Sequence, residues 1–327
     1  MQVSVEPFGR TVEAREGDNL LTVLREREVP VSYSCMAGRC GTCTCKVLEG
    51  RLAVHGDTSR EVISVEAGQS VLACQAHLVG DCRIEIPNAD DIVVHPARII
   101  KSTVTSIEDL THDIKRITLA LAKPLQFSPG QYATLQFAPG LVRPYSMAVT
   151  ESASELEFHI RAVPGGKVTT YVNTVLKVGD AVRLSGPLGT AYLRKNSPAP
   201  VICIAGGTGL APVLSVLRGM DEAGMENPVH VYFGARTSSD IYGIEWLNEI
   251  QARRPQMSTN VVVSQRQDGE SWRAGIVTHA VDEDWQALTG WRAYLAGAPA
   301  MVEAANELLV RKGIDPGQIH ADAFYAT

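Results

Sequence analysis

Four cysteines fall within the eleven residues CMAGRCGTCTC, positions 35–45, and their spacing restricts how this segment can fold. Cys35, Cys40 and Cys43 follow a C-x4-C-x2-C pattern, and Cys74 comes after thirty intervening residues. Thiols grouped in this way can form disulfides, hold a structural zinc ion or hold an iron–sulfur cluster. Other features of the chain distinguish these three chemistries.

One close triplet with a distant fourth cysteine is typical of a plant-type 2Fe-2S cluster, whereas structural zinc usually takes two close pairs. Gly38 and Gly41 fit the cluster, because glycine lets backbone N–H groups approach the sulfur atoms. We therefore predict a 2Fe-2S cluster and retain zinc as the alternative. The expected ligands are Cys35, Cys40, Cys43 and Cys74.

The cysteine count also bears on the cellular compartment. Seven cysteines is an odd number, and the N-terminal segment MQVSVEPFGR lacks the basic and then apolar pattern of a signal peptide. These features favour reduced thiols and predict a cytoplasmic protein. Cys82 and Cys203 are expected to be buried non-ligands, because unpaired cysteines in apolar segments behave as small hydrophobes. Cys45 is also expected to be a non-ligand, because a fifth thiolate has no vacancy to fill at the cluster.

Charge and hydropathy exclude two classes of partner. The net charge is −6 and no basic run offers a footprint for phosphates, so no nucleic-acid partner is expected. No apolar run approaches the about 18 residues that a membrane span needs. Residues 1–97 contain 14 acidic and 9 basic residues, so most of the negative charge lies at the cysteine-rich end. This acidity indicates either a solvated face or a docking surface for a partly basic protein.

The length of 327 residues predicts more than one domain, and the residue pattern divides the chain into residues 1–92, 97–196 and 197–327. The second domain contains six strand-like segments between polar turns and one helical stretch, 166–177, which together predict a six-stranded antiparallel barrel. From about residue 200 strands alternate with helices, which predicts a doubly wound parallel sheet.

The pattern of the first domain predicts short strands around the cysteine loop. Period-2 patterning predicts a hairpin that turns at Phe8–Gly9, and Asp18 is the expected N-cap of a short helix. Strands are expected at KVLEGRLAV, 46–54, and DCRIEIP, 81–87, with a linker over 88–96.

Two motifs of the second domain suit one extended phosphate-bearing ligand. In RPYS, Arg143 can pair a pyrophosphate, Tyr145 can lie against a planar ring, and Ser146 can bind a ring nitrogen. In GGKVTT, Gly166 precedes a helix that carries Thr169, which is typical of a phosphate-binding helix N-terminus. An ordinary turn is the alternative interpretation of RPYS.

The third domain carries a glycine-rich turn, IAGGTGLAP, between its first strand and helix. A doubly wound sheet binds nucleotides at this position, although Pro212 stands where the last glycine of G-x-G-x-x-G would be. A tight turn without a ligand is the alternative. A second turn, AGAPAMV from Ala296, follows the fourth strand. If the strand order is 3-2-1-4-5, both turns open on one crevice.

With these motifs in order, the whole chain resembles the ferredoxin–NAD reductases of bacterial aromatic-ring dioxygenases, most closely the naphthalene-dioxygenase type. The resemblance rests on the cysteine spacing, RPYS, GGTGLAP, YFGAR and the terminal ADAF. It implies a β-grasp 2Fe-2S ferredoxin domain, an FAD-binding barrel and an NAD(P)-binding α/β domain. It also implies an electron relay from NADH through FAD and the cluster to a separate small ferredoxin, of the Rieske type, that feeds an oxygenase.

The resemblance assigns expected roles to further residues. Ser146 resembles the hydroxyl near flavin N5, Tyr145 a flavin contact, and Phe324 the C-terminal aromatic that covers the flavin. The remaining FAD contacts implied are Arg143, Pro144, Gly165, Gly166, Val168 and Thr169. Those implied for NAD are Gly206, Gly207, Thr208, Gly209, Arg236, Asp240, Tyr242, Gly297 and Pro299.

In one respect the chain departs from the family pattern. Relatives of this type commonly carry Cys-Gly-x-Pro after the fourth strand, and Ala296 replaces that cysteine. NADH is the expected coenzyme, with NADPH tolerated. Asp240 would repel a 2′-phosphate if it points inward, whereas Arg236, Ser238 and Ser239 could contact one.

Three other functions fit parts of the sequence. A two-component reductase would donate directly to its oxygenase and would need the same three domains. A redox-sensing or electron-carrier module would have lost catalysis, against which RPYS and GGTGLAP argue. A zinc-stapled binding protein would lack the iron.

Overall fold

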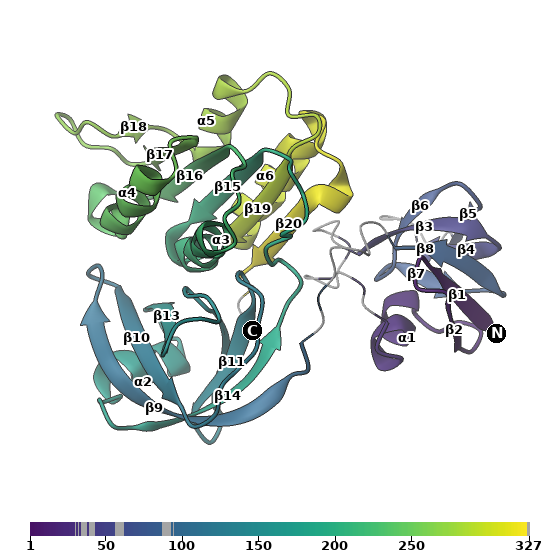
Figure 1. Cartoon of the computed structure of the whole chain (residues 1–327), viewed down its shortest axis with the longest axis horizontal. Helices are drawn as coiled ribbons and strands as arrows, with labels where there is room; N and C mark the ends of the chain where they lie inside the picture. Colours follow the sequence, from purple (N-terminus) through teal and green to yellow (C-terminus); the bar gives the residue numbers. More distant parts are fainter. Residues whose placement is uncertain are drawn as a thin grey trace. The chain divides into compact units, whose positions relative to one another are not determined.

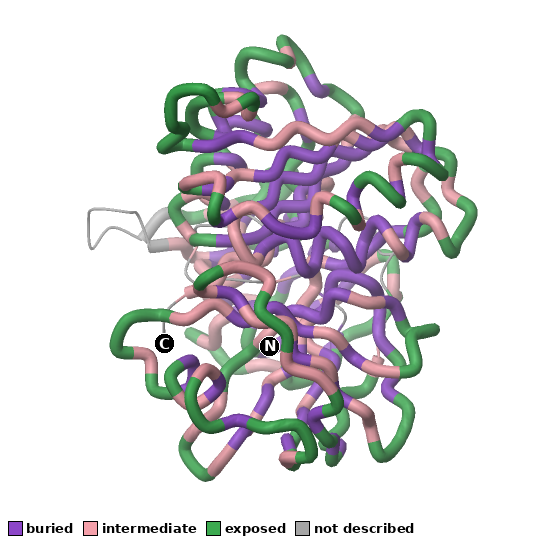
Figure 2. The backbone as a smooth tube through the Cα atoms, turned by 90° about the vertical axis from the view of Figure 1, so that its left-hand side faces the viewer, coloured by how far each residue is buried: buried purple, intermediate pink, exposed green. Residues whose placement is uncertain are grey.

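The computed structural model describes residues 1–29, 31, 33, 38, 43–55, 62–86, 93 and 95–325. The chain forms two compact units, residues 1–94 with 315–319, and residues 95–314 with 320–327 (Figure 1). Within the described ranges, none of the helices combines the length and apolar character that a membrane span requires. Buried stretches of backbone follow the strands, and exposed stretches lie mainly in turns (Figure 2).

The N-terminal unit is a mixed β-sheet with one helix. Its elements are β1 (Gln2–Glu6), β2 (Arg10–Glu13), α1 (Leu20–Glu26), β3 (Thr44–Glu49), β4 (Arg51–His55), β5 (Val62–Glu66), β6 (Ser70–Leu72), β7 (Ala76–Leu78) and β8 (Cys82–Glu85). A five-stranded sheet has the order β2-β1-β8-β3-β6, and β5-β4-β7 form a second sheet. The predicted hairpin is confirmed, with Val3 opposite Val12.

Two local predictions in this unit were wrong. Asn19, not Asp18, caps α1, because the Asn19 side chain accepts the Thr22 N–H at 3.2 Å, whereas Asp18 accepts the Arg15 N–H at 2.8 Å. The single strand expected over 46–54 is two strands in different sheets, β3 and β4. Gly50 separates them with φ of +79°, a conformation that glycine adopts without strain. Most of the expected linker, 88–96, lies outside the described residues.

The next part of the chain is the predicted barrel. It consists of β9 (Arg98–Asp109), β10 (Ile114–Leu121), β11 (Tyr132–Ala138), β12 (Leu141–Ser146), β13 (Leu156–Arg161), α2 (Lys167–Thr174) and β14 (Ala181–Leu188). The six strands are ordered β12-β11-β14-β9-β10-β13, and a bridge between Met147 and Phe158 links the two ends of the sheet. Alternate strand residues point inward, which gives a core that includes Ile117, Leu135 and Phe158.

The predicted doubly wound sheet is also present. Its elements are β15 (Val201–Gly206), η2 (Gly207–Gly209), α3 (Leu210–Glu222), β16 (Val229–Ala235), η3 (Ser238–Asp240), α4 (Ile244–Arg253), β17 (Met257–Val263), β18 (Arg273–Ala274), α5 (Val277–Asp284), β19 (Arg292–Gly297), α6 (Pro299–Arg311), η4 (Pro316–Gln318) and β20 (Ile319–Ala323). The order β18-β17-β16-β15-β19-β20 contains the expected 3-2-1-4-5 arrangement, with β18 as a short extra edge. Strands β15 and β19 are parallel neighbours.

Helix α3 packs between this sheet and the barrel. Ser215, fully buried on α3, donates to the Val149 carbonyl at 2.6 Å and accepts the Gly130 N–H at 3.0 Å. Gly219, one turn further, leaves room for Pro129, because a β-carbon there would lie 2.5 Å from the Pro129 Cγ. The six-stranded sheet that contains β15 to β20, called here the nucleotide-type sheet, is therefore joined to the barrel through α3.

The turns after β15 and β19 also touch each other. A β-carbon on Gly209 would collide with the Ala296 carbonyl and lie 2.9 Å from the Gly297 nitrogen. A β-carbon on Gly297 would lie 2.8 Å from the Gly206 carbonyl oxygen. The two glycine turns thus meet, as the strand order predicted.

The close contact between the two turns predicts that a side chain at Gly209 will lower the stability of the protein. Gly209→Ala forces one of the two turns to move, so we expect the free energy of unfolding to fall by about 2 kcal/mol or more. Gly80→Ala is the matched control, because nothing lies within 4 Å of a β-carbon at that position. Thermal unfolding measures both variants, and equal melting temperatures would contradict the steric argument.

Candidate active site

The described half of the cysteine site fits an iron–sulfur cluster. Cys43 is buried and Cys74 half-buried, and the Cys74 N–H points at the Cys43 sulfur at 3.4 Å. Gln75 reaches the Cys74 sulfur with its Nε2 at 3.6 Å. N–H groups aimed at sulfur stabilise a thiolate, which is the state that ligates metal. Cys35 and Cys40 lie outside the described residues.

The other three cysteines are buried, which was expected for Cys82 and Cys203. Burial raises the pKa of Cys45 to about 12, of Cys82 to about 11 and of Cys203 to about 12. Thiols in this environment stay protonated and are poor metal ligands.

The RPYS segment forms the end of strand β12. Arg143 and Pro144 are exposed, whereas Tyr145 is half-buried and Ser146 is buried. The Tyr145 ring meets Phe137 edge-on at 6.3 Å, and burial raises the Tyr145 pKa to about 12. The segment therefore offers a cation, a fixed aromatic ring and a hydroxyl in succession.

The GGKVTT segment forms the start of helix α2. Thr169 Oγ1 accepts the Val163 N–H at 3.1 Å and lies 3.2 Å from the Gly166 carbonyl oxygen, so this hydroxyl shapes the loop. Val168 is buried in the barrel core. Among the residues that the structure describes, no side chain caps α2 at Gly166, and Gly165 has φ of +73° with open space beside it. An uncapped helix start beside open space fits a phosphate group.

The glycine turn after β15 has a barrel residue above it. Gly207 has φ of +54°, and a β-carbon there would lie 2.8 Å from Nη1 of Arg161, at the end of β13. Gly206 lies against Met301, and Thr208 is half-buried. Arg161 thus places positive charge beside the N-terminus of α3, a position at which doubly wound sheets commonly bind a pyrophosphate.

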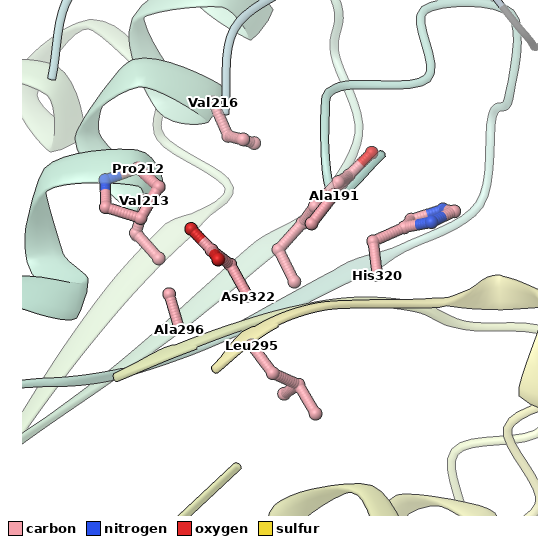
Figure 3. Close-up of a pocket in the computed structure, with 9 residues that line it drawn as sticks. Ala191, Pro212, Val213, Val216, Leu295, Ala296, His320 and Asp322 are labelled. Carbon is pink, nitrogen blue, oxygen red and sulfur yellow. The ribbon is translucent and has the colours of Figure 1, made fainter. Parts of the chain in front are cut away.

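Ser146 of the barrel meets an acid from the last strand. Its Oγ donates to Asp322 Oδ2 at 2.7 Å, across 176 residues of sequence. Burial raises the Asp322 pKa to about 6, although the Ser146 hydrogen bond opposes the shift. Asp322 points into a cavity of about 10 Å³ beside Pro212 and Ala296, which is enough for about one water molecule (Figure 3).

The C-terminal aromatic lies at the same end of the sheet. The Phe324 N–H donates to the Gly297 carbonyl at 2.9 Å, and the Tyr325 hydroxyl lies 3.1 Å from Glu303 Oε1. Pro299 is the first residue of α6, directly after this turn. Phe324 is therefore two residues from Asp322, on the side of the glycine turns.

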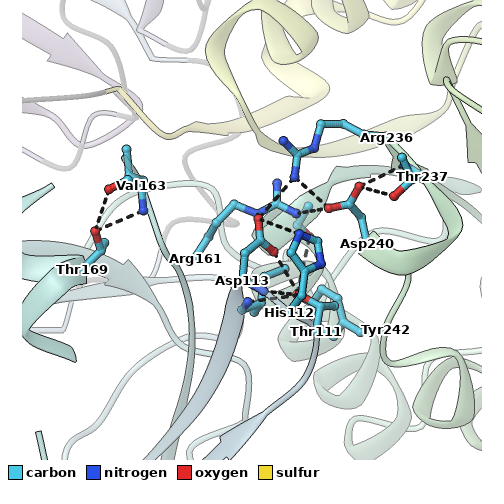
Figure 4. Close-up of polar contacts among 12 residues, drawn as sticks. Thr111, His112, Asp113, Arg161, Val163, Thr169, Arg236, Thr237, Asp240 and Tyr242 are labelled. Carbon is cyan, nitrogen blue, oxygen red and sulfur yellow. Dashed lines mark hydrogen bonds and ion pairs between the residues drawn. The ribbon is translucent and has the colours of Figure 1, made fainter. Parts of the chain in front are cut away.

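The three residues expected near the adenosine differ in their surroundings. Arg236, which donates to Asp240 (Figure 4), is exposed, whereas Asp240 and Tyr242 are buried. The Tyr242 hydroxyl lies 3.0 Å from His159 Nδ1. Asp240 accepts the Thr237 N–H at 2.9 Å. Burial opposes ionisation of Asp240, but hydrogen bonds from Arg236 and Thr237 outweigh it and lower its pKa.

Three residues of this site were not expected from the sequence to be functional. Asp322 lies in the ADAF motif and could have been found as an acid within an apolar strand. Asp113 and Arg161 carry no local signal, because their partners lie far along the chain.

A cysteine site, a barrel with an uncapped helix start, and a doubly wound sheet with paired glycine turns define an iron–sulfur flavoprotein oxidoreductase. Three family matches agree with this class. Residues 3–79 match the 2Fe-2S iron–sulfur cluster binding domain, residues 101–192 the oxidoreductase FAD-binding domain, and residues 203–307 the oxidoreductase NAD-binding domain.

Whole-chain relatives define the family more narrowly. The chain is 58% identical to the reductase component of the naphthalene 1,2-dioxygenase/salicylate 5-hydroxylase systems of Ralstonia sp., over 99% of both chains. It is 50% identical to the naphthalene 1,2-dioxygenase system reductase component of Pseudomonas putida, again over 99% of both. The chain therefore belongs to the ferredoxin–NAD(P)+ reductase components of naphthalene-dioxygenase type, with 2Fe-2S, FAD and NAD as its cofactors.

Solved structures show the same architecture. An Amycolatopsis cytochrome P450 reductase is 34% identical with a TM-score of 0.72, and the match covers 99% of this chain and 98% of that one. A ferredoxin reductase in carbazole 1,9a-dioxygenase is 29% identical with a TM-score of 0.68 and the same coverage.

The raised Asp322 pKa predicts a pH-dependent stability. The folded-state pKa of about 6 exceeds the ordinary value of 3.8, so the buried carboxylate lowers stability above pH 6, and this loss disappears toward pH 4. Asp322→Asn keeps an acceptor for Ser146 but cannot ionise. We expect the FAD-loaded variant to melt about 2–4 °C above wild type at pH 8, with the difference vanishing near pH 4. A difference independent of pH would refute the assignment.

The alanine at position 296 leads to a prediction about the rate of flavin reduction. Its side chain lines the cavity beside Asp322, so a thiol fits there. We expect Ala296→Cys to speed NADH-driven flavin reduction by about threefold, or roughly 0.65 kcal/mol in activation free energy. Ala296→Ser is the control of matched size. Stopped-flow absorption measures the rate, and an unchanged rate in the cysteine variant would show that the thiol has no role.

Proposed function

We propose that this chain passes electrons from NAD(P)H to a separate small ferredoxin of the Rieske type, which supplies an aromatic-ring dioxygenase in the cytoplasm. The observation that carries the proposal is the Ser146–Asp322 hydrogen bond. It joins the flavin-type barrel to the nucleotide-type sheet beside the two glycine turns. Direct hydride transfer needs two bound groups to meet at one such point.

The barrel residues suit FAD. Arg143 is proposed to pair the pyrophosphate, Tyr145 to lie against the isoalloxazine and Ser146 to bind near N5. The remaining proposed contacts are Pro144, the backbone of Gly165 and Gly166, Val168 and Thr169. Because Thr169 holds the loop through Val163, its proposed contribution is to keep the N–H groups of α2 in position.

The nucleotide-type sheet suits NAD(P)H. The turn Gly206–Gly209 is proposed to hold the pyrophosphate, and Gly297 and Pro299 to border the nicotinamide. Arg236, Asp240 and Tyr242 are proposed to form the adenosine end, with Asp240 and Tyr242 acting from buried positions. Phe324 is proposed to cover the flavin until the nicotinamide displaces it.

Ser146 and Asp322 hold a proton between Oγ and Oδ2 where the two domains meet. Since the Asp322 pKa of about 6 is close to physiological pH, the pair can take up or release that proton. When bound, FAD exchanges the hydride of NAD(P)H for single electrons, which the 2Fe-2S cluster carries. Cys35, Cys40, Cys43 and Cys74 are the proposed ligands. Domain boundaries of 1–92, 97–196 and 197–327 likewise stay predictions.

An anaerobic NADH titration of the purified protein tests the proposal. We expect flavin and iron–sulfur absorption bands in the wild type, both bleached by NADH. Cys74→Ser should lose the iron–sulfur band and keep the flavin band, whereas Cys82→Ser, which changes a buried non-ligand, should keep both. A wild-type spectrum with a flavin band alone would mean that the cysteines hold no iron.

Direct donation to an oxygenase is the second candidate, because a similar structure is named as a cytochrome P450 reductase. Product formation by the cognate oxygenase, with and without added ferredoxin, separates the two acceptors. A strict requirement for ferredoxin supports the proposal, and full activity without it supports direct donation.

A further inference from the structure

Four charged side chains join the barrel to the nucleotide-type sheet. Asp113, between β9 and β10, lies 3.2 Å from Arg161 Nε and 3.2 Å from Arg236 Nη2. Asp240 Oδ1 lies 2.8 Å from the same Arg236 nitrogen and 3.4 Å from Arg161 Nη2 (Figure 4). His112 Nε2 lies 4.0 Å from Asp113. Two cations and two anions therefore balance within one network.

Arg236 occupies the position that distinguishes the two coenzymes. It follows β16, the strand next to β15, and in doubly wound sheets an arginine near the adenosine ribose accommodates a 2′-phosphate. Its side chain is 58% exposed, whereas those of Asp113 and Asp240 are 17% and 3% exposed. The guanidinium thus reaches solvent while both carboxylates lie beneath it.

The two carboxylates differ in what else they do. Asp240 closes a capping box with Thr237, whose N–H and hydroxyl both donate to its Oδ2 at 2.9 Å, so the turn itself needs Asp240. Asp113 has a single hydroxyl donor, Thr111, at 3.0 Å. Asp113 is therefore the partner that can be changed without dismantling the turn that carries Arg236.

We propose that Asp113, a residue of the flavin-type barrel, sets the preference for NADH over NADPH by occupying Arg236. The inference rests on the proposed function of the site. With Asp113 in place, a 2′-phosphate meets an arginine whose charge is already neutralised and lies near two carboxylates, which costs the charge-assisted contact that would recognise it. Asp113 is a positioning residue, since it acts through Arg236.

Binding of adenosine fragments to the FAD-loaded protein tests this without hydride transfer. Calorimetry compares 2′,5′-ADP with 5′-AMP, which differ by the 2′-phosphate alone. We expect Asp113→Asn to raise the ratio of the two affinities, in favour of 2′,5′-ADP, by about tenfold. The kcat/KM ratio of NADPH to NADH should rise with it. Asp109→Asn is the matched control, because Asp109 pairs with Lys115 on the same hairpin and does not contact Arg236.

Arg236→Ala completes a double-mutant cycle. Alone it should change the affinity ratio by less than about threefold, because Asp113 and Asp240 already neutralise the guanidinium. In the Asp113→Asn background it should abolish the gain. An unchanged ratio in Asp113→Asn, or a gain that survives without Arg236, would overturn the inference. A wild type that is reduced by neither coenzyme would instead refute the proposed function.

Discussion

Helix α3 is the element on which the geometry of this reductase depends. One side of it closes the nucleotide-type sheet, and the other packs directly on the barrel through Ser215 and Gly219. A buried hydroxyl with both a donor and an acceptor partner tolerates little displacement, because either broken bond leaves a buried polar group unpaired. The same helix begins at the glycine turn after β15. The position of that turn relative to the barrel follows from the packing of one helix.

That packing explains why residues far apart in sequence share one site. Ser146 comes from a barrel strand and Asp322 from the last strand of the sheet, and Arg161 extends from the barrel over Gly207. In the proposed function, transfer between the two nucleotides would draw on groups from both domains. The packing that holds the domains together would then matter as well as the residues proposed to touch ligands.

Much of this arrangement was predictable from local patterns. Alternating apolar residues identified the barrel strands, and strand–helix alternation predicted a doubly wound sheet. The structure has the 3-2-1-4-5 order that the interpretation of the glycine turns assumed. The two wrong predictions have local causes. Asp18 accepts the Arg15 N–H, so that Asn19 caps the helix in its place. Gly50, with its positive φ, ends a strand within an apolar run. Both outcomes depend on backbone conformation, which the pattern of residue types does not specify.

The contacts of the charged network were not predictable in this way. Asp113 and Arg236 are 123 residues apart, and no periodicity or spacing relates a carboxylate in one domain to a guanidinium in another. Likewise, the ADAF motif marks Asp322 as an acid in an apolar strand, but nothing in the sequence identifies Ser146 as its partner. Such pairs become visible only once the packing of α3 has set the two domains side by side.

The close packing of α3 on the barrel restricts which residue position 219 can hold. Glycine within a helix is less favourable than alanine by about 1 kcal/mol, so a survey for thermostabilising substitutions would select Gly219→Ala. In this chain the missing methyl group is the space that Pro129 occupies. An added methyl group would force Pro129 or α3 to move, so the clash with the barrel opposes the gain in helix propensity. At this position, the residue with the higher helix propensity packs less well against the barrel.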